Sequence, residues 1–202
     1  MKIRFEKETF RFFYKQFSLF PIRILDDVPG SDLNYDLVLT YGYIDHEKGF
    51  CFEVLALCKS EGNRSDDLSD EMSIVIPAEK VKDEEAEIVN DDELLKERYK
   101  DRIRILEENF EDERLTEIRE LSYLDDLRDE IYIDDVEVYL HKKEMDLEIC
   151  HVRLESHEDG RFTGILLDEP DHDLGCHKGD TIGFVLQKIS DGTWMALADM
   201  NN

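Results

Sequence analysis

The chain has 202 residues, of which 51 are Asp or Glu and 25 are Lys or Arg, so its formal net charge is −26 with histidine neutral. Such a charge repels nucleic acid phosphates and anionic membranes and attracts basic proteins, so we expect no direct nucleic acid partner and no membrane partner. Eleven Phe, eight Tyr and an apolar content of 41% nevertheless indicate a folded chain with a substantial core.

Charged side chains interrupt every apolar run, so no segment approaches the roughly 20 apolar residues that a membrane-spanning helix needs. The basic beginning of the chain does not resemble a signal peptide, because Arg11, Lys15 and Arg23 fall where its apolar core would have to be. The four cysteines form no Cys-x-x-Cys pair, which favours reduced thiols. We therefore expect a cytoplasmic protein.

The aromatic residues Phe10, Phe13, Phe17 and Phe20 recur at steps of three and four before Pro21. This spacing predicts a short N-terminal helix with one face in the core. An alternative is a basic aromatic helix that touches a membrane surface or a partner, but the acidic remainder of the chain argues against the membrane.

Two segments of the chain read as β-hairpins. Residues 37–44 and 50–58 are strand-like and flank a turn in which Gly49 supplies a positive φ. Residues 147–154 and 161–167 form a similar pair around a second glycine-containing turn. Each hairpin predicts an antiparallel sheet unit.

The middle of the chain reads as helical, since residues 78–159 contain no Gly and no Pro. Apolar residues at steps of four, four, three and four predict one amphipathic helix: Leu95, Tyr99, Ile103, Leu106 and Phe110. Leu115 and Ile118 leave this stripe, which predicts a break within residues 111–116.

Further strands are expected at residues 133–140, 181–188 and 194–197. Helices segregated from turn-connected strands predict an α+β fold with mostly antiparallel sheet units at both ends, a central helical segment at about 90–131 and a short N-terminal helix. We expect three segments: an N-terminal helix and hairpin region at 1–80, an acidic helical middle at 81–132 and a C-terminal α+β region at 133–202. The alternative is that all three form one compact domain.

Acidic residues crowd the end of the predicted central helix: Glu107, Glu108, Glu111, Asp112 and Glu113. Carboxylates at this end oppose the helix dipole, and like charges four residues apart repel by roughly a few tenths of a kcal/mol per pair. An acidic composition that maintains solubility is one explanation. The other is a surface that meets a basic partner, and these five residues are its candidates.

A second candidate site combines His151, His172, Cys176 and His177 in a ligand-binding cleft of the C-terminal sheet. Imidazole and thiolate are zinc ligands, but the paired two-residue spacing of structural zinc sites is absent, so we expect no metal and no cofactor. The chain also lacks a glycine-rich phosphate loop, a G-x-S-x-G elbow and an H-E-x-x-H helix. No motif specifies a reaction, which favours a protein that is not an enzyme.

The C-terminal quarter carries a pattern of short motifs: Phe162-Thr-Gly-Ile-Leu-Leu-Asp-Glu-Pro170, Gly179-Asp180-Thr-Ile182 and Asp191-Gly-Thr-Trp194. This pattern resembles the YegJ-like family of small bacterial domains of unknown function over residues 146–197. Asp168 stands where that family usually has Asn, and Trp194 comes three residues after Asp191 instead of directly after it. The resemblance implies a small α+β module of a bacterial cytoplasm with no established activity.

Three functions remain open from the sequence. The leading hypothesis is a non-enzymatic binding or regulatory module whose acidic surface contacts a basic protein. The first alternative is a small-molecule-binding or hydrolytic site in a cleft of the C-terminal sheet. The second is a DNA mimic that antagonises a nucleic-acid-binding protein, for which acidic residues spaced along the helices are suited.

Overall fold

The structure, a computed structural model, describes residues 2–26, 35–60, 65–69, 72–90, 93–190 and 192–201. The chain divides into two compact units, Met1–Glu111 and Asp112–Asn202. This division differs from the three segments expected from the sequence, because the central helices do not form a layer of their own. The helices before Glu111 pack on the first sheet, and those after it belong to the second unit.

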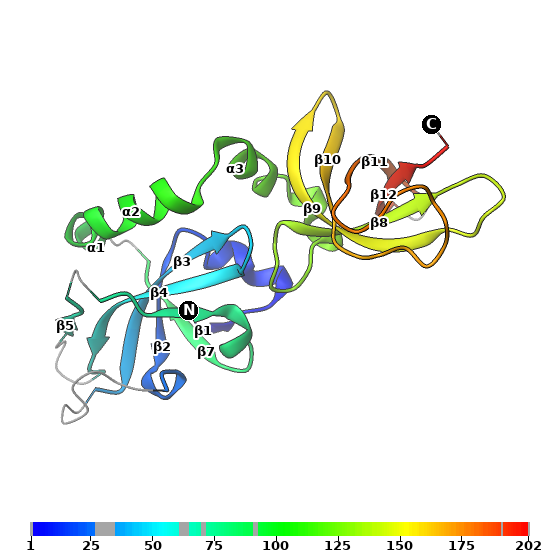
Figure 1. Cartoon of the computed structure of the whole chain (residues 1–202). Helices are drawn as coiled ribbons and strands as arrows, with labels where there is room; N and C mark the ends of the chain where they lie inside the picture. Colours follow the sequence, from blue (N-terminus) through cyan, green and yellow to red (C-terminus); the bar gives the residue numbers. More distant parts are fainter. Residues whose placement is uncertain are drawn as a thin grey trace. The chain divides into compact units, whose positions relative to one another are not determined.

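Unit 1 is a seven-stranded sheet with the strand order β1-β7-β2-β3-β4-β5, and β6 also pairs with β4. Its strands are β1 (Lys2–Arg4), β2 (Phe17–Pro21), β3 (Leu37–Asp45), β4 (Gly49–Cys58), β5 (Ser65–Asp67), β6 (Val75–Pro77) and β7 (Glu85–Ile88). Its helical elements are η1 (Lys7–Phe12), η2 (Ile22–Ile24), η3 (Ala78–Lys80), α1 (Glu93–Arg98) and α2 (Lys100–Phe110). Figure 1 shows α1 and α2 running along one face of this sheet.

The two faces of the sheet in unit 1 carry different cores. One face is aromatic, and the rings of Phe13, Phe20 and Phe50 all contact that of Phe52 at centroid distances of 4.9–5.6 Å. The other face receives the stripe of α1 and α2, and all five residues predicted to form that stripe pack there. The amphipathic stripe expected from the sequence is therefore confirmed, but two helices carry it instead of one, because α1 ends at Arg98 and α2 begins after Tyr99. The second helix ends at Phe110, before the predicted break.

The prediction of an N-terminal helix from the aromatic stripe is wrong for its second half, which contains Phe17 and Phe20. The segment forms the 3-10 helix η1, reverses at Lys15 with φ of 56°, and continues as strand β2. Phe17 and Phe20 then lie on opposite faces of the sheet, since side chains alternate along a strand. Phe17 packs on Tyr99 of the helix side, and Phe20 joins the aromatic core.

Unit 2 contains a closed five-stranded barrel with the order β10-β11-β12-β8-β9. Its elements are α3 (Glu113–Arg119), η4 (Ser122–Leu127), β8 (Asp135–His141), β9 (Glu148–Glu158), β10 (Arg161–Leu166), β11 (Thr181–Lys188) and β12 (Trp194–Asp199). Successive strands are antiparallel, and the parallel pairing of β12 with β8 closes the barrel. An up-and-down path of five strands requires this, because its first and last strands point the same way. The coarse α+β prediction holds, and the barrel is an addition to it.

Several residues that carry the family resemblance have structural roles in the barrel. Phe162 and Leu166 are buried in its core. Gly164 lies at a register shift between β9 and β10, where an added Cβ would stand 2.3 Å from the carbonyl oxygen of Arg153. Gly179 has φ of 93°, and the Asp180 carboxylate accepts the His177 backbone N–H at 2.8 Å. Asp191 lies outside the described residues.

Candidate functional site

The five acidic residues at the end of the central helix do not share one environment. Glu111 accepts a hydrogen bond from the Tyr14 hydroxyl at 2.8 Å and pairs with Lys15 at 3.1 Å. Asp112 is the N-cap of α3 and accepts the backbone N–H of Arg114 at 2.9 Å. These two carboxylates therefore have internal structural roles, which explains their placement without a partner.

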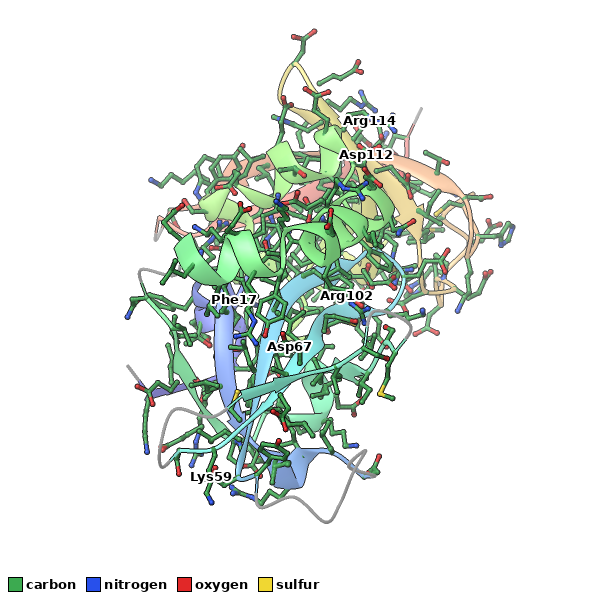
Figure 2. All side chains as sticks on the ribbon, turned by 90° about the vertical axis from the view of Figure 1, so that its left-hand side faces the viewer. Phe17, Lys59, Asp67, Arg102, Asp112 and Arg114 are labelled. Carbon is green, nitrogen blue, oxygen red and sulfur yellow. The ribbon has the colours of Figure 1, made fainter. Side chains whose placement is uncertain are left out.

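The other three members of this acidic group are exposed. Glu108 pairs with Arg104 at 2.8 Å, one turn earlier on α2, and the Arg104 pKa is raised by that hydrogen bond. Glu107 and Glu113 point into solvent from the ends of α2 and α3. Figure 2 shows Asp112 and Arg114 side by side at the start of α3.

The three histidines of the second candidate site each meet a different carboxylate. His151 Nδ1 lies 2.8 Å from Asp168, His172 Nδ1 lies 3.0 Å from Glu148, and His177 Nδ1 lies 2.7 Å from Glu169. In every pair the same carboxylate also accepts a backbone N–H, from His151, Asp171 and Lys178 respectively. The pairs thus fasten the segment between β10 and β11 to itself and to β9, and they do not converge on one point.

The same hydrogen bonds shift the pKa values of the paired groups. The Glu169 carboxylate raises the pKa of His177, and His177 in turn holds the pKa of Glu169 below its ordinary value. Burial acts to raise the pKa of Asp168, but its bonds from the backbone and ring of His151 prevail and lower it. Among the described residues, no three His, Cys, Asp or Glu side chains gather into a possible metal site.

Three of the four cysteines are buried, and burial raises the pKa of all four thiols. Cys176 and Cys150 are buried in the barrel core, and burial raises the pKa of Cys150 to about 11. Burial likewise raises the pKa of Cys51 to about 11 and that of half-buried Cys58. Burial also raises the pKa of Cys176, and a thiol with a raised pKa is a weaker nucleophile at neutral pH.

Two cavities that no sequence pattern predicted lie in unit 1, where α1 and α2 meet the sheet. One has a volume of about 360 Å³, with apolar walls that include Leu19, Leu39 and Leu95 and with Lys59 and Arg98 among its lining residues. Arg98 is bound by Asp67 at 2.7 Å, and Figure 2 shows Asp67 on the sheet below the helices. The apolar periodicity of the strands was the only sequence signal for these cavities. It does not distinguish residues that line a cavity from residues that fill the core.

The second cavity, of about 290 Å³, borders a buried ion pair between Glu53 of β4 and Arg102 of α2. The Glu53 side chain is 2% exposed, and it also accepts the Ser73 hydroxyl at 3.1 Å. This pair fixes α2 on the sheet. None of His151, His172, Cys176 and His177 lines either cavity.

Unit 2 has a formal net charge of −15, and unit 1 accounts for the other −11 of the chain's −26. Residues 112–202 contain 24 Asp or Glu and nine Lys or Arg. Three of those nine cations are turned inward, because Arg119 pairs with Asp134, Arg128 with Asp125 and Arg153 with Asp135. Each pair also takes up one carboxylate, so the excess of 15 acidic over basic residues in this unit is unchanged.

Comparisons with protein-family models, with curated proteins and with solved structures found no match. The resemblance to the YegJ-like family stays a prediction. No helix in the described part of the chain combines the length and the apolar character needed to cross a membrane.

Proposed function

We propose that the chain is a binding module that recognises a basic protein through the acidic surface of unit 2. One observation carries this proposal: unit 2 contains 24 Asp or Glu against nine Lys or Arg, and three of these cations are already paired with carboxylates of the same unit. The position of the surface is revised from the sequence analysis, because Glu111 and Asp112 are engaged internally.

Such a surface attracts a basic partner and raises its association rate, and salt weakens both effects. Binding is favoured over hydrolysis because the three histidines pair with three different carboxylates and burial raises the pKa of the Cys176 thiol. A nucleic-acid-binding protein is one class of basic partner, so the DNA-mimic hypothesis is a special case of this proposal.

The test is capture of partners on the immobilised full chain at about 50 mM and about 500 mM salt. The decisive variant neutralises four exposed acids of unit 2: Glu137→Gln, Glu144→Gln, Asp146→Asn and Glu158→Gln. The matched control neutralises four exposed acids of unit 1: Glu8→Gln, Glu47→Gln, Glu79→Gln and Glu85→Gln.

We expect a basic protein that is released at high salt, is lost from the unit 2 variant and is retained by the control. Displacement of DNA from that protein by the chain would identify a DNA mimic. The proposal is refuted if no basic, salt-sensitive partner is captured, or if both variants retain it equally.

A second candidate function is small-molecule binding in the larger cavity of unit 1. Its volume of about 360 Å³ lies in the range of ligand pockets, and its walls are mainly apolar with a few charged groups. The test is thermal stabilisation by a library of small amphipathic compounds, with Leu39→Phe as a variant that fills the cavity. A stabilising compound that acts equally on the filled variant would exclude this site.

A further inference from the structure

The outer face of the barrel carries an apolar row that crosses four neighbouring strands. Ile149 of β9 pairs with Tyr139 of β8, Tyr139 with Leu197 of β12, and Leu197 with Val185 of β11. These four residues, named here the outer row, are directly opposite one another in register, so their side chains are neighbours on the same face.

The outer row points away from the barrel core. Its neighbours along each strand, such as Val138, Cys150, Ala196 and Phe184, are buried in that core, and side chains alternate between the two faces of a strand. Ile149 is 51% exposed and Val185 is 38% exposed. The outer face of a small barrel normally carries polar residues, so a contiguous apolar row there indicates a contact surface.

The surroundings of the outer row are charged. Glu137 lies two residues before Tyr139 and Asp199 lies two residues after Leu197, so an exposed carboxylate shares the outer face on each side of the row. At the β11 end the row stops at a cation, because the residue of β10 that pairs in register with Val185 is Arg161, whose guanidinium lies over Gly183.

We infer that the outer row is the docking surface of the basic partner and that it receives an apolar segment flanked by Lys or Arg. This inference rests on the proposed function and names its contact face. The row supplies the water-excluding centre of the interface, and Glu137 and Asp199 meet the flanking cations. A second copy of the chain is a poor occupant, since each copy carries a net charge of −26 and the two acidic faces repel.

The test is selection of a displayed random peptide library on the immobilised full chain, followed by affinity measurement with the best synthetic peptide. The variant of the row is Ile149→Thr with Val185→Thr, which keeps the β-branched shape and removes apolar surface. The matched control is Ile189→Thr with Val75→Thr, which makes the same two changes at exposed positions outside the row.

We expect enriched peptides that combine Lys or Arg with aliphatic or aromatic residues, and a loss of affinity of about tenfold or more in the row variant with little change in the control. Chemical-shift perturbation on the unsubstituted chain gives a second readout, which does not depend on the variant folding. Shifts centred on the four residues of the row support the inference.

The remaining outcomes separate the two proposals. Basic peptides that bind the row variant as well as the original chain overturn the docking surface and leave the proposed function standing. An absence of basic peptides overturns the proposed function itself. If the selected peptides need the row but contain no Lys or Arg, the inference of a basic partner is overturned. If sedimentation shows a dimer that the row variant abolishes, the row is an interface with a second copy of the chain.

Discussion

The buried ion pair between Arg119 and Asp134 provides a direct test of the structure of unit 2. Arg119 is the last residue of α3, and its guanidinium donates two bonds to the Asp134 carboxylate, at 3.0 Å and 2.7 Å. The side chains are 0% and 2% exposed. Asp134→Asn keeps the shape of the side chain but leaves the buried guanidinium without its counter-charge.

Removal of one partner from a buried ion pair costs about 3–5 kcal/mol, because the remaining charge is left uncompensated in a low dielectric. The retained amide oxygen of Asn places the expected loss near the lower value, at about 3 kcal/mol. Domains of this size unfold with roughly 5–15 kcal/mol, so the variant loses a large part of its stability and its Tm falls by on the order of 10–20 °C.

Urea unfolding followed by tryptophan fluorescence measures this loss specifically. Trp194 is the only tryptophan of the chain, and it lies half-buried on β12 with its ring 5.6 Å from that of Tyr123, so its emission reports on unit 2. Glu130→Gln, which removes an exposed carboxylate of the same unit, serves as the control and should change stability by less than about 0.5 kcal/mol.

A loss below about 1 kcal/mol in Asp134→Asn would refute the reasoning, because it would mean that the guanidinium is solvated or compensated elsewhere. The double variant Arg119→Met with Asp134→Leu removes both charges. It should be more stable than Asp134→Asn, since no unpaired charge remains inside.

Three further substitutions have effects that the structure predicts. Asp112→Ala removes the N-cap of α3 and should lower the free energy of unfolding by about 1 kcal/mol in the fluorescence assay, and an unchanged midpoint would contradict the cap. The raised pKa of His177 means that its contribution to stability is complete below the ordinary histidine pKa of about 6.5 and is lost as the pH rises through the raised value. In an NMR titration the His177 midpoint should therefore fall in Glu169→Gln, and an unmoved midpoint would argue against the pair. Gly42→Ala places a Cβ 2.2 Å from the Phe13 carbonyl oxygen and should cost about 1–3 kcal/mol in unit 1, whereas a neutral result by far-UV circular dichroism would show that the backbone can yield there.

Local sequence patterns predicted an element correctly where its structure depends only on residues close by in the chain. The stripe from Leu95 to Phe110 faces the sheet as its period requires. The turns ending in Gly49 and Gly160 both need a positive φ, at 81° and 78°, and the glycines marked them correctly. At the second turn the strands extend further than expected, because Asp159 also adopts a positive φ and makes a two-residue hairpin turn.

Other elements depend on partners that lie far away in the chain. β7 has the acidic pattern of a solvent-exposed segment at Glu85 and Glu87, yet it pairs with both β1 and β2. The stripe from Phe10 to Phe20 has helical spacing. A strand in a sheet that is buried on both faces also needs apolar residues on both sides, so the same spacing fits a strand equally well. Local spacing cannot distinguish these cases when the environment is apolar on every side.

The candidate sites follow the same division. The sequence by itself determined the charge, the amphipathic stripe and the glycine turns, because each depends on composition or on neighbours within a few residues. Only the tertiary structure decided which carboxylates are used internally, where the cavities lie and that apolar residues of four strands align on the outside of the barrel. Those features arise from long-range pairing and register, and a shift of one residue in register would turn every side chain of a strand to the opposite face.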